Sequence, residues 1–496
     1  MNLRSFLARQ EQRQLIVIEA LYQHPNGITL EKLLKICPFS LKTIRNTIAE
    51  ITSHFPGFEI DFHQNRYYWQ APFDFGLDRL YDYLMQETSE MRFLEHLLFE
   101  DCFTFSDCAN TLYLSNASFH RLHHNFSQLL APFNVKIANR PVRIEGNEVF
   151  IRALYTLYFC EKRYAAAYLL PDSKSDHALS DLVRTILKEN QLPQNYRLHE
   201  QLYFAGAVSL WRQNNNHPLQ EKFKSNFIKT ATKKTETALF QLKDSLLTMN
   251  WHYDFEETLW PLCYDYLLLS FEHFTLAKKT NARIQELSEL TTRFLKDLLA
   301  LTSTTISFLQ LEELVWHFCN ENYIYLKNSD FIAILSNSRR GFVLNYEKKF
   351  PHIIAGLKQF IGDYGIKNNI QITIDHMYHQ LFLIITLLPQ VLEYWQFKTR
   401  TLILSDVSLA HPHYLQKKLQ QHFINQTDFE LIDCVNTHHQ KMHEQFEAYD
   451  LIISTFSPQE MFGHLPIVTI KPIPDFHDFL KIESALQQVT AHKHSA

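Results

Sequence analysis

The chain has 496 residues, 46% of them apolar, and a formal net charge of −5 at neutral pH. This length suggests roughly three or four domains with apolar cores, and the acidic balance excludes a protein that is basic throughout. With only 10 glycines and 14% aromatic residues, the composition favours a mainly helical protein and argues against glycine-rich nucleotide-binding loops.

Cysteine usage and hydropathy indicate an intracellular protein. The seven cysteines are scattered and form no CxxC pair, which is typical of a reduced cytosol rather than a disulfide framework. The N-terminus has no apolar signal core, and the most apolar run, Leu381 to Leu388, is too short to cross a bilayer. We therefore expect a cytoplasmic protein without a membrane partner.

Two segments within the first 150 residues repeat each other at a constant offset of 75 residues. The first has Thr29, Ser40, Ile44, Ile51, Phe55, Phe58 and Ile60 where the second has Thr104, Ser115, Phe119, Phe126, Leu130, Phe133 and Val135. A repeat without gaps predicts one structural unit present twice.

The first copy has the pattern of a winged helix-turn-helix. A helix is predicted from Gln12 to Tyr22, a short one after the N-cap Thr29, and a third after the N-cap Ser40. The short helix turns Leu30, Leu33 and Leu34 inward, and the third has a buried stripe of Leu41, Ile44, Ile48, Ile51 and Phe55. Alternating runs at 58–62 and 67–69 predict a hairpin wing.

The second copy follows the same plan. Helices are predicted at Glu90 to Phe99, at Ser106 to Leu112, and after the N-cap Ser115, and the wing pairs residues 135–137 with 142–144. The buried stripe of its third helix is Phe119, Leu122, Phe126 and Leu129. Two copies in register favour a protein that places a helix in a DNA groove twice.

The outer faces of the third helices carry residue types that contact phosphates and base edges. The DNA-contact candidates are Lys42, Thr43, Arg45 and Asn46 in the first copy, Asn116, Ser118, His120 and Arg121 in the second, and Arg66 and Arg140 in the wings. Residues 115–144 contain four Lys or Arg and no acid, whereas residues 71–100 are acidic. We therefore expect modest affinity for double-stranded DNA per monomer, raised by dimerisation.

The chain from residue 148 to about 392 is helical in pattern. Clear helices are expected at 196–211, 260–278, 284–299, 309–319, 350–361 and 372–394, with loops or loop-flanking segments at 212–218 and 225–237. After residue 395 the pattern changes: strands at 400–404, 429–435, 451–454 and 467–470 alternate with helices at 410–422 and 476–488. This alternation predicts a small α/β domain with a largely parallel sheet.

This order of elements resembles the Mga/AtxA family of bacterial regulators over essentially the whole chain. The most specific local signal is Ile144-Glu145-Gly146 with Ile151-Arg152 behind it, which looks like the domain junction of related regulators and antiterminators. The resemblance implies a mainly α multidomain fold. Its expected domains are two winged helix-turn-helix domains (1–70, 71–160), two helical phosphotransferase-system regulation domains (161–285, 286–394) and an enzyme IIB-like α/β domain (395–496).

The resemblance also implies a transcription regulator of a low-GC Gram-positive bacterium, tied to sugar supply and often to virulence or host adaptation. Such regulators favour AT-rich or curved DNA, act as homodimers and accept phosphate on histidines from phosphocarrier proteins. The candidate phosphohistidines here are His199, His317, His273, His376 and His379. The first regulation domain departs from the usual pattern, because Ala205 occupies the position seven residues before Arg212 where a histidine is usual.

The last domain departs from an active enzyme IIB. The loop after its first strand, Leu404 to Ser408, holds no cysteine, and Cys434 ends a different strand. Without a thiolate in that loop a phosphocysteine cannot form. The resemblance therefore suggests a scaffold retained for oligomerisation or sensing.

Two other classes of protein are open alternatives. An enzyme would need convergent chemistry, but the histidine clusters at 120–124, 411–413 and 438–443 are not joined by cysteines or carboxylates at ligand spacing. No nucleophile elbow, HExxH or Walker sequence occurs, so we expect no catalytic residues, no metal and no cofactor. An RNA-binding antiterminator shares the regulation domains, but its RNA-binding module is small and β-rich, unlike residues 1–145.

Overall fold

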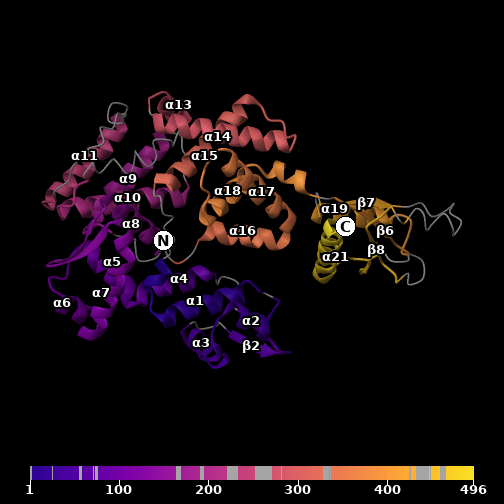
Figure 1. The fold of residues 1–496 in the computed structure, drawn as a ribbon, viewed down its shortest axis with the longest axis horizontal. Helices are drawn as coiled ribbons and strands as arrows, with labels where there is room; N and C mark the ends of the chain where they lie inside the picture. Colours follow the sequence, from indigo (N-terminus) through magenta and orange to yellow (C-terminus); the bar gives the residue numbers. More distant parts are fainter. Residues whose placement is uncertain are drawn as a thin grey trace. The chain divides into compact units, whose positions relative to one another are not determined.

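The computed structural model describes most of the chain (Figure 1). The described residues are 3–24, 26–54, 59–70, 72, 76–162, 169–189, 195–219, 233–251, 271–280, 282–327, 335, 337–396, 398–423, 426–431, 446, 448–457 and 465–495. They form two compact units, one of residues 1–291 with 315–337 and one of 292–314 with 338–496.

The first unit begins with the predicted winged helix-turn-helix. Its elements are η1 (Leu3–Phe6), α1 (Arg9–Tyr22), β1 (Ile28–Thr29), α2 (Leu30–Ile36), α3 (Leu41–His54), β2 (Glu59–His63) and β3 (Arg66–Gln70). The sheet is antiparallel with the order β1-β3-β2. Gln64 and Asn65 both have positive φ, the geometry of a tight hairpin turn, so the wing is as predicted. Leu34, expected to face inward, is 37% exposed.

The second copy repeats this arrangement. It consists of α4 (Leu77–Glu87), α5 (Ser89–Phe99), α6 (Phe105–Thr111), α7 (Asn116–Leu130), η2 (Ala131–Phe133), β4 (Val135–Asn139) and β5 (Val142–Gly146). The backbone N–H of Val142 donates to the carbonyl of Cys102 at 2.9 Å. This contact occupies the place of the pairing between β1 and β3 in the first copy. Helix α4 was not among the predicted elements.

A helical array follows in the same unit. Its helices are α8 (Glu148–Glu161), α9 (Ser173–Glu189), α10 (Tyr196–Asn214), α11 (Lys233–Thr248), α13 (Phe271–Thr280) and parts of α14 (Ala282–Leu301) and α15 (Phe308–Lys327). One apolar core continues from both winged domains through α8 to α11. The two polar segments predicted as loops or loop-flanking include helix ends, because α10 extends to Asn214 and α11 begins at Lys233. Helices α9 and α11 were not predicted, and most of the helix expected at 260–278 lies outside the described residues.

The second unit continues with α16 (Ser338–Lys349), α17 (Pro351–Lys367), α18 (Ile374–Leu387) and η4 (Pro389–Trp395). The single helix predicted for 372–394 is wrong, because α18 ends at Leu387. Pro389 lacks a backbone N–H and its ring disfavours a helical residue before it, so the chain continues as a short 3₁₀ segment.

The unit ends with the predicted α/β fold. Strands β6 (Thr399–Leu404), β7 (Thr427–Leu431), β8 (Leu451–Ser454) and β9 (Ile467–Thr469) form a parallel sheet in the order β7-β6-β8-β9. Side chains alternate between the faces, with Ile403 on the face covered by α19 (His411–His422) and α21 (Phe476–Ser495), and Leu402 and Leu404 on the other. Among the described helices, none is long and apolar enough to be a membrane span.

Candidate nucleic-acid interface

The third helix of each copy begins with a hydroxyl cap. The backbone N–H of Thr43 donates to Ser40 Oγ at 3.1 Å, and that of Ser118 donates to Ser115 Oγ at 3.2 Å. Neither α3 nor α7 has an acid in its first turn. The positive end of each helix dipole is therefore not neutralised by a local carboxylate and can face a phosphate.

Helix α3 separates its apolar and polar faces. Ile44 and Ile51 are buried, whereas Lys42, Arg45 and Asn46 are exposed. Thr43, also predicted to contact DNA, is half-buried at the cap, and its hydroxyl lies 2.8 Å from Ser40 Oγ.

Helix α7 is anchored by aromatic packing. The rings of Phe119 and Phe126 pack on Phe93 of α5, with centroid distances of 5.2 and 5.1 Å. On the opposite side Asn116, His120 and Arg121 are exposed, and Ser118 is half-buried at the cap.

His123 has a different environment from its neighbours on α7. It is half-buried, and its ring packs on Phe105 at 4.5 Å. Burial, reinforced by His120 and His124, lowers the pKa of His123. His123 therefore packs between α7 and Phe105 and is not part of the exposed face of the helix.

The wings expose Arg66, the first residue of β3, and Arg140 in the turn between β4 and β5. Folding neutralises part of the basic stretch of the second copy, because an acid just after it pairs with two of its cations. Glu145 lies 3.4 Å from Lys136 and 2.6 Å from Arg143, so both cations are paired. Of the four cations at 115–144, Arg121 and Arg140 remain the exposed ones without an ion pair in the described parts of the chain.

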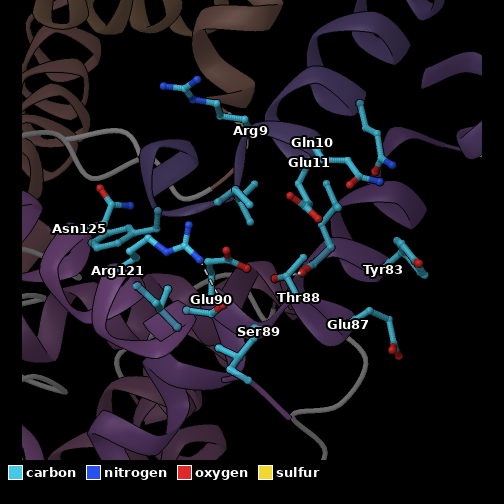
Figure 2. Close-up of a pocket in the computed structure, with 18 residues that line it drawn as sticks. Arg9, Gln10, Glu11, Tyr83, Glu87, Thr88, Ser89, Glu90, Arg121 and Asn125 are labelled. Carbon is cyan, nitrogen blue, oxygen red and sulfur yellow. Dashed lines mark hydrogen bonds between the residues drawn. The ribbon is translucent and has the colours of Figure 1, made fainter. Parts of the chain in front are cut away.

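A cavity of about 710 Å³ opens beside α7, bounded by the start of α1, the α4–α5 turn and α7 (Figure 2). Arg121 lies at its edge, with its guanidinium 3.4 Å from Ser118 Oγ of its own helix. Glu11 and Glu90 also line this cavity, and burial together with the nearby Glu11 raises the pKa of Glu90. Arg121 of α7 thus lines the same cavity as two carboxylates.

Residues 73–159, from just before α4 to near the end of α8, match the family described as the Mga helix-turn-helix domain. The chain is also 22% identical, over 92% of its own length and 93% of the relative's, to a Streptococcus pneumoniae serotype 4 protein named as a candidate trans-acting regulator. The chain is therefore similar to Mga-like regulators, in its second winged domain and over most of its length. The resemblance drawn from the order of its elements is thereby confirmed.

The Mga-like chain places its candidate phosphohistidines in unlike environments. His317 on α15 is exposed, with its ring 4.4 Å from that of Trp316, and His199 on α10 is half-buried, 3.3 Å from Ser180 Oγ of α9. His376 on α18 is half-buried. The side chain of His273 lies outside the described residues.

His379 is enclosed. Its side chain is 3% exposed, and Nδ1 lies 3.0 Å from the guanidinium of Arg339. Burial, the Arg339 charge and His376 lower the pKa of His379 to about 3. A phosphoryl donor reaches an exposed imidazole such as His317 more easily than this one.

The loop after β6, where an active enzyme IIB has its cysteine, is held by hydrogen bonds. Ser405 Oγ lies 2.7 Å from His411 Nδ1, and His411 Nε2 lies 2.8 Å from the carbonyl oxygen of Pro472. Cys434 lies outside the described residues.

Sequence reasoning missed a group of buried charges behind the second winged domain. Arg212 of α10 is fully buried against Glu148 of α8, and Arg152 also donates to Glu148 at 3.1 Å. The available signal was the polar Ile144-Glu145-Gly146-Asn147-Glu148 junction, but nothing in it points to a partner 64 residues away.

Proposed function

We propose that this Mga-like chain is a DNA-binding transcription regulator in which α3 and α7 lie against a duplex. The observation that carries the proposal is that two hydroxyl-capped helices, with no acid in the first turn, expose Lys42, Arg45 and Arg121 in one compact unit. Arg66 and Arg140 of the wings extend the same basic set toward the phosphate backbone.

The side chains available favour recognition of DNA shape. The exposed set on the two helices contains few groups that form bidentate contacts with a base: Asn46, Asn116 and the arginines. Arginines at wing tips suit a narrow minor groove, which is typical of AT-rich or intrinsically curved DNA. The proposed target is therefore curved, AT-rich duplex rather than a long base-specific consensus.

The proposed regulation is phosphorylation of helical-domain histidines in response to sugar supply, with the regulator working as a cytoplasmic homodimer. The exposure of His317 supports it as the first acceptor, and His199, in contact with α9, as the second. A phosphoryl group adds about two negative charges, enough to change how helices pack. We expect a phosphocarrier protein to label the full-length chain in vitro, and His317→Ala to remove most of that label.

Binding assays with the full-length chain test the proposal. Fluorescence anisotropy would compare a curved AT-rich duplex, a straight GC-rich duplex and a structured RNA at several salt concentrations. We expect the curved duplex to bind most tightly, with affinity that falls steeply as salt rises. Preference for the RNA would replace the proposal with an antiterminator, and equal weak binding to all three would refute it.

A further inference from the structure

We propose that His96, Asp101, Cys102 and Cys108 form a zinc-binding site at the turn between α5 and α6. The site goes beyond DNA binding and does not depend on it. It lies entirely within the second winged domain, so all four side chains belong to one compact part of the first unit.

Three of the side chains already converge. His96 Nδ1, a carboxylate oxygen of Asp101 and Cys102 Sγ all lie within 4.8 Å of one another. His96 Nδ1 lies 2.7 and 2.9 Å from the two oxygens of Asp101. A tetrahedral zinc ion needs these atoms only slightly closer to a common centre, at about 2.0 to 2.3 Å from the metal.

Cys108 supplies a fourth donor. It is fully buried on α6, and Cys102 is 2% exposed. Cys108 lies near Cys102, because each of the two thiols contributes to the pKa shift of the other. His96, Asp101 and Cys102 therefore converge, and Cys108 lies beside this group as the candidate fourth ligand.

The backbone explains why these residues meet. Glu100 ends α5 in the left-handed conformation, with φ of 57°, and its N–H donates to the carbonyl of His96 at 2.9 Å. This reversal returns Asp101 to the last turn of α5. The capping box of Thr104 and Asp107 then starts α6, which carries Cys108.

The donor set selects the metal. One imidazole, one carboxylate and two thiols match the nitrogen, oxygen and sulfur ligands of tetrahedral zinc and suit calcium or magnesium poorly. On binding, each thiol would lose its proton to solvent, and the two thiolates and the carboxylate would outweigh the charge of the ion by one. The spacing His-x4-Asp-Cys-x5-Cys contains no CxxC and no pair of histidines, which is why no such site is predicted from the sequence.

The position of the site gives it a structural consequence. The carbonyl of Cys102 accepts the hydrogen bond from Val142 N–H that ties strand β5 of the wing to this loop. Glu100, in the same loop, lies 2.6 Å from His217 after α10. A metal ion at Cys102 would therefore fix the loop that joins the wing to the helical array.

Cobalt titration of the tag-free, full-length chain tests the site. Zinc-depleted protein should bind one equivalent of Co²⁺ with an intense thiolate-to-cobalt absorption band, and Zn²⁺ should displace it. Cys102→Ser should remove the band, and Asp101→Asn and Cys108→Ser should each weaken binding at least about tenfold. The matched controls are Cys37→Ser, the buried cysteine of the first copy, and His124→Gln on α7, neither of which should alter it.

Absence of a thiolate band in the folded wild-type chain would overturn the proposal, because His96 and Asp101 would then be only a hydrogen-bonded pair beside two core thiols. A band that persists in Cys102→Ser would overturn it equally. If Cys102→Ser does not fold, judged by circular dichroism, Asp101→Asn decides. Its side chain is half exposed and outside the core, and unchanged affinity in that variant would refute the assignment.

Discussion

Arg212 donates to both carboxylate oxygens of Glu148, from Nε and from a terminal nitrogen, at 2.9 Å in each case. The Arg212 side chain is fully buried and that of Glu148 is 7% exposed. The same guanidinium donates to the carbonyl of Ile144 at 3.0 Å, at the end of the second wing. Arg212 of the helical array thus binds the segment 144–148, which connects the second wing to α8.

This bidentate pair should be essential for stability. Removal of Arg212 leaves the buried Glu148 with Arg152 but without its bidentate partner, so Arg212→Met should lower the free energy of unfolding by about 3–5 kcal/mol. Urea unfolding of the full-length chain measures the change. Lys35→Ala, which breaks the exposed Lys35–Glu31 pair, is the control and should cost less than about 1 kcal/mol. Equal effects in the two variants would show that the Arg212 pair contributes little.

The recognition helices should carry the affinity for DNA. Arg45→Ala combined with Arg121→Ala should abolish binding while helicity stays unchanged, because both cations are exposed and outside the core. Where residual binding is measurable, the slope of log affinity against log salt should fall by about two. Lys243→Ala, an exposed cation on α11, is the control. Gel shifts that match the wild type would refute the placement of α3 and α7.

The hydroxyl caps should stabilise the recognition helices measurably. Ser115→Ala removes the acceptor for the Ser118 N–H and should cost about 1 kcal/mol of unfolding free energy, as should Ser40→Ala in α3. Thermal or urea unfolding provides the measurement. Ser53→Ala near the end of α3 should change stability by no more than about 0.5 kcal/mol. A cap variant as stable as this control would contradict the capping role.

Stability of the second unit should depend on pH through His379. Its pKa falls from 6.5 to about 3, mainly by burial, so between these values the folded unit binds fewer protons than the unfolded chain. The contribution is fully present above pH 6.5 and is lost as pH falls, at up to about 1.4 kcal/mol per pH unit. His379→Gln should flatten this dependence by about one proton, whereas the exposed His317→Gln should not. If the dependence of stability on pH is the same in His379→Gln, the difference in bound protons between the folded and unfolded states comes from another group.

Much of the local structure followed from the sequence, because caps, apolar periodicity and turn residues act within a few positions along the chain. Thr29, Ser40 and Ser115 cap the helices that they were predicted to cap. The strands of the last domain occur in the predicted order and are parallel, since short apolar runs that alternate with helices have few other solutions. The break at Pro389 was available in the sequence as well, from the missing N–H.

The pairing of charges was decided by the tertiary structure alone. The sequence showed a basic stretch up to Arg143, but folding places Glu145 against both Lys136 and Arg143. It showed His376 and His379 as equivalent candidates three residues apart, but only the packed helices bury His379 beside Arg339. Periodicity fixes which side of a helix a residue occupies, whereas burial, the pKa and an ion pair such as Arg212–Glu148 depend on which distant segment covers that side.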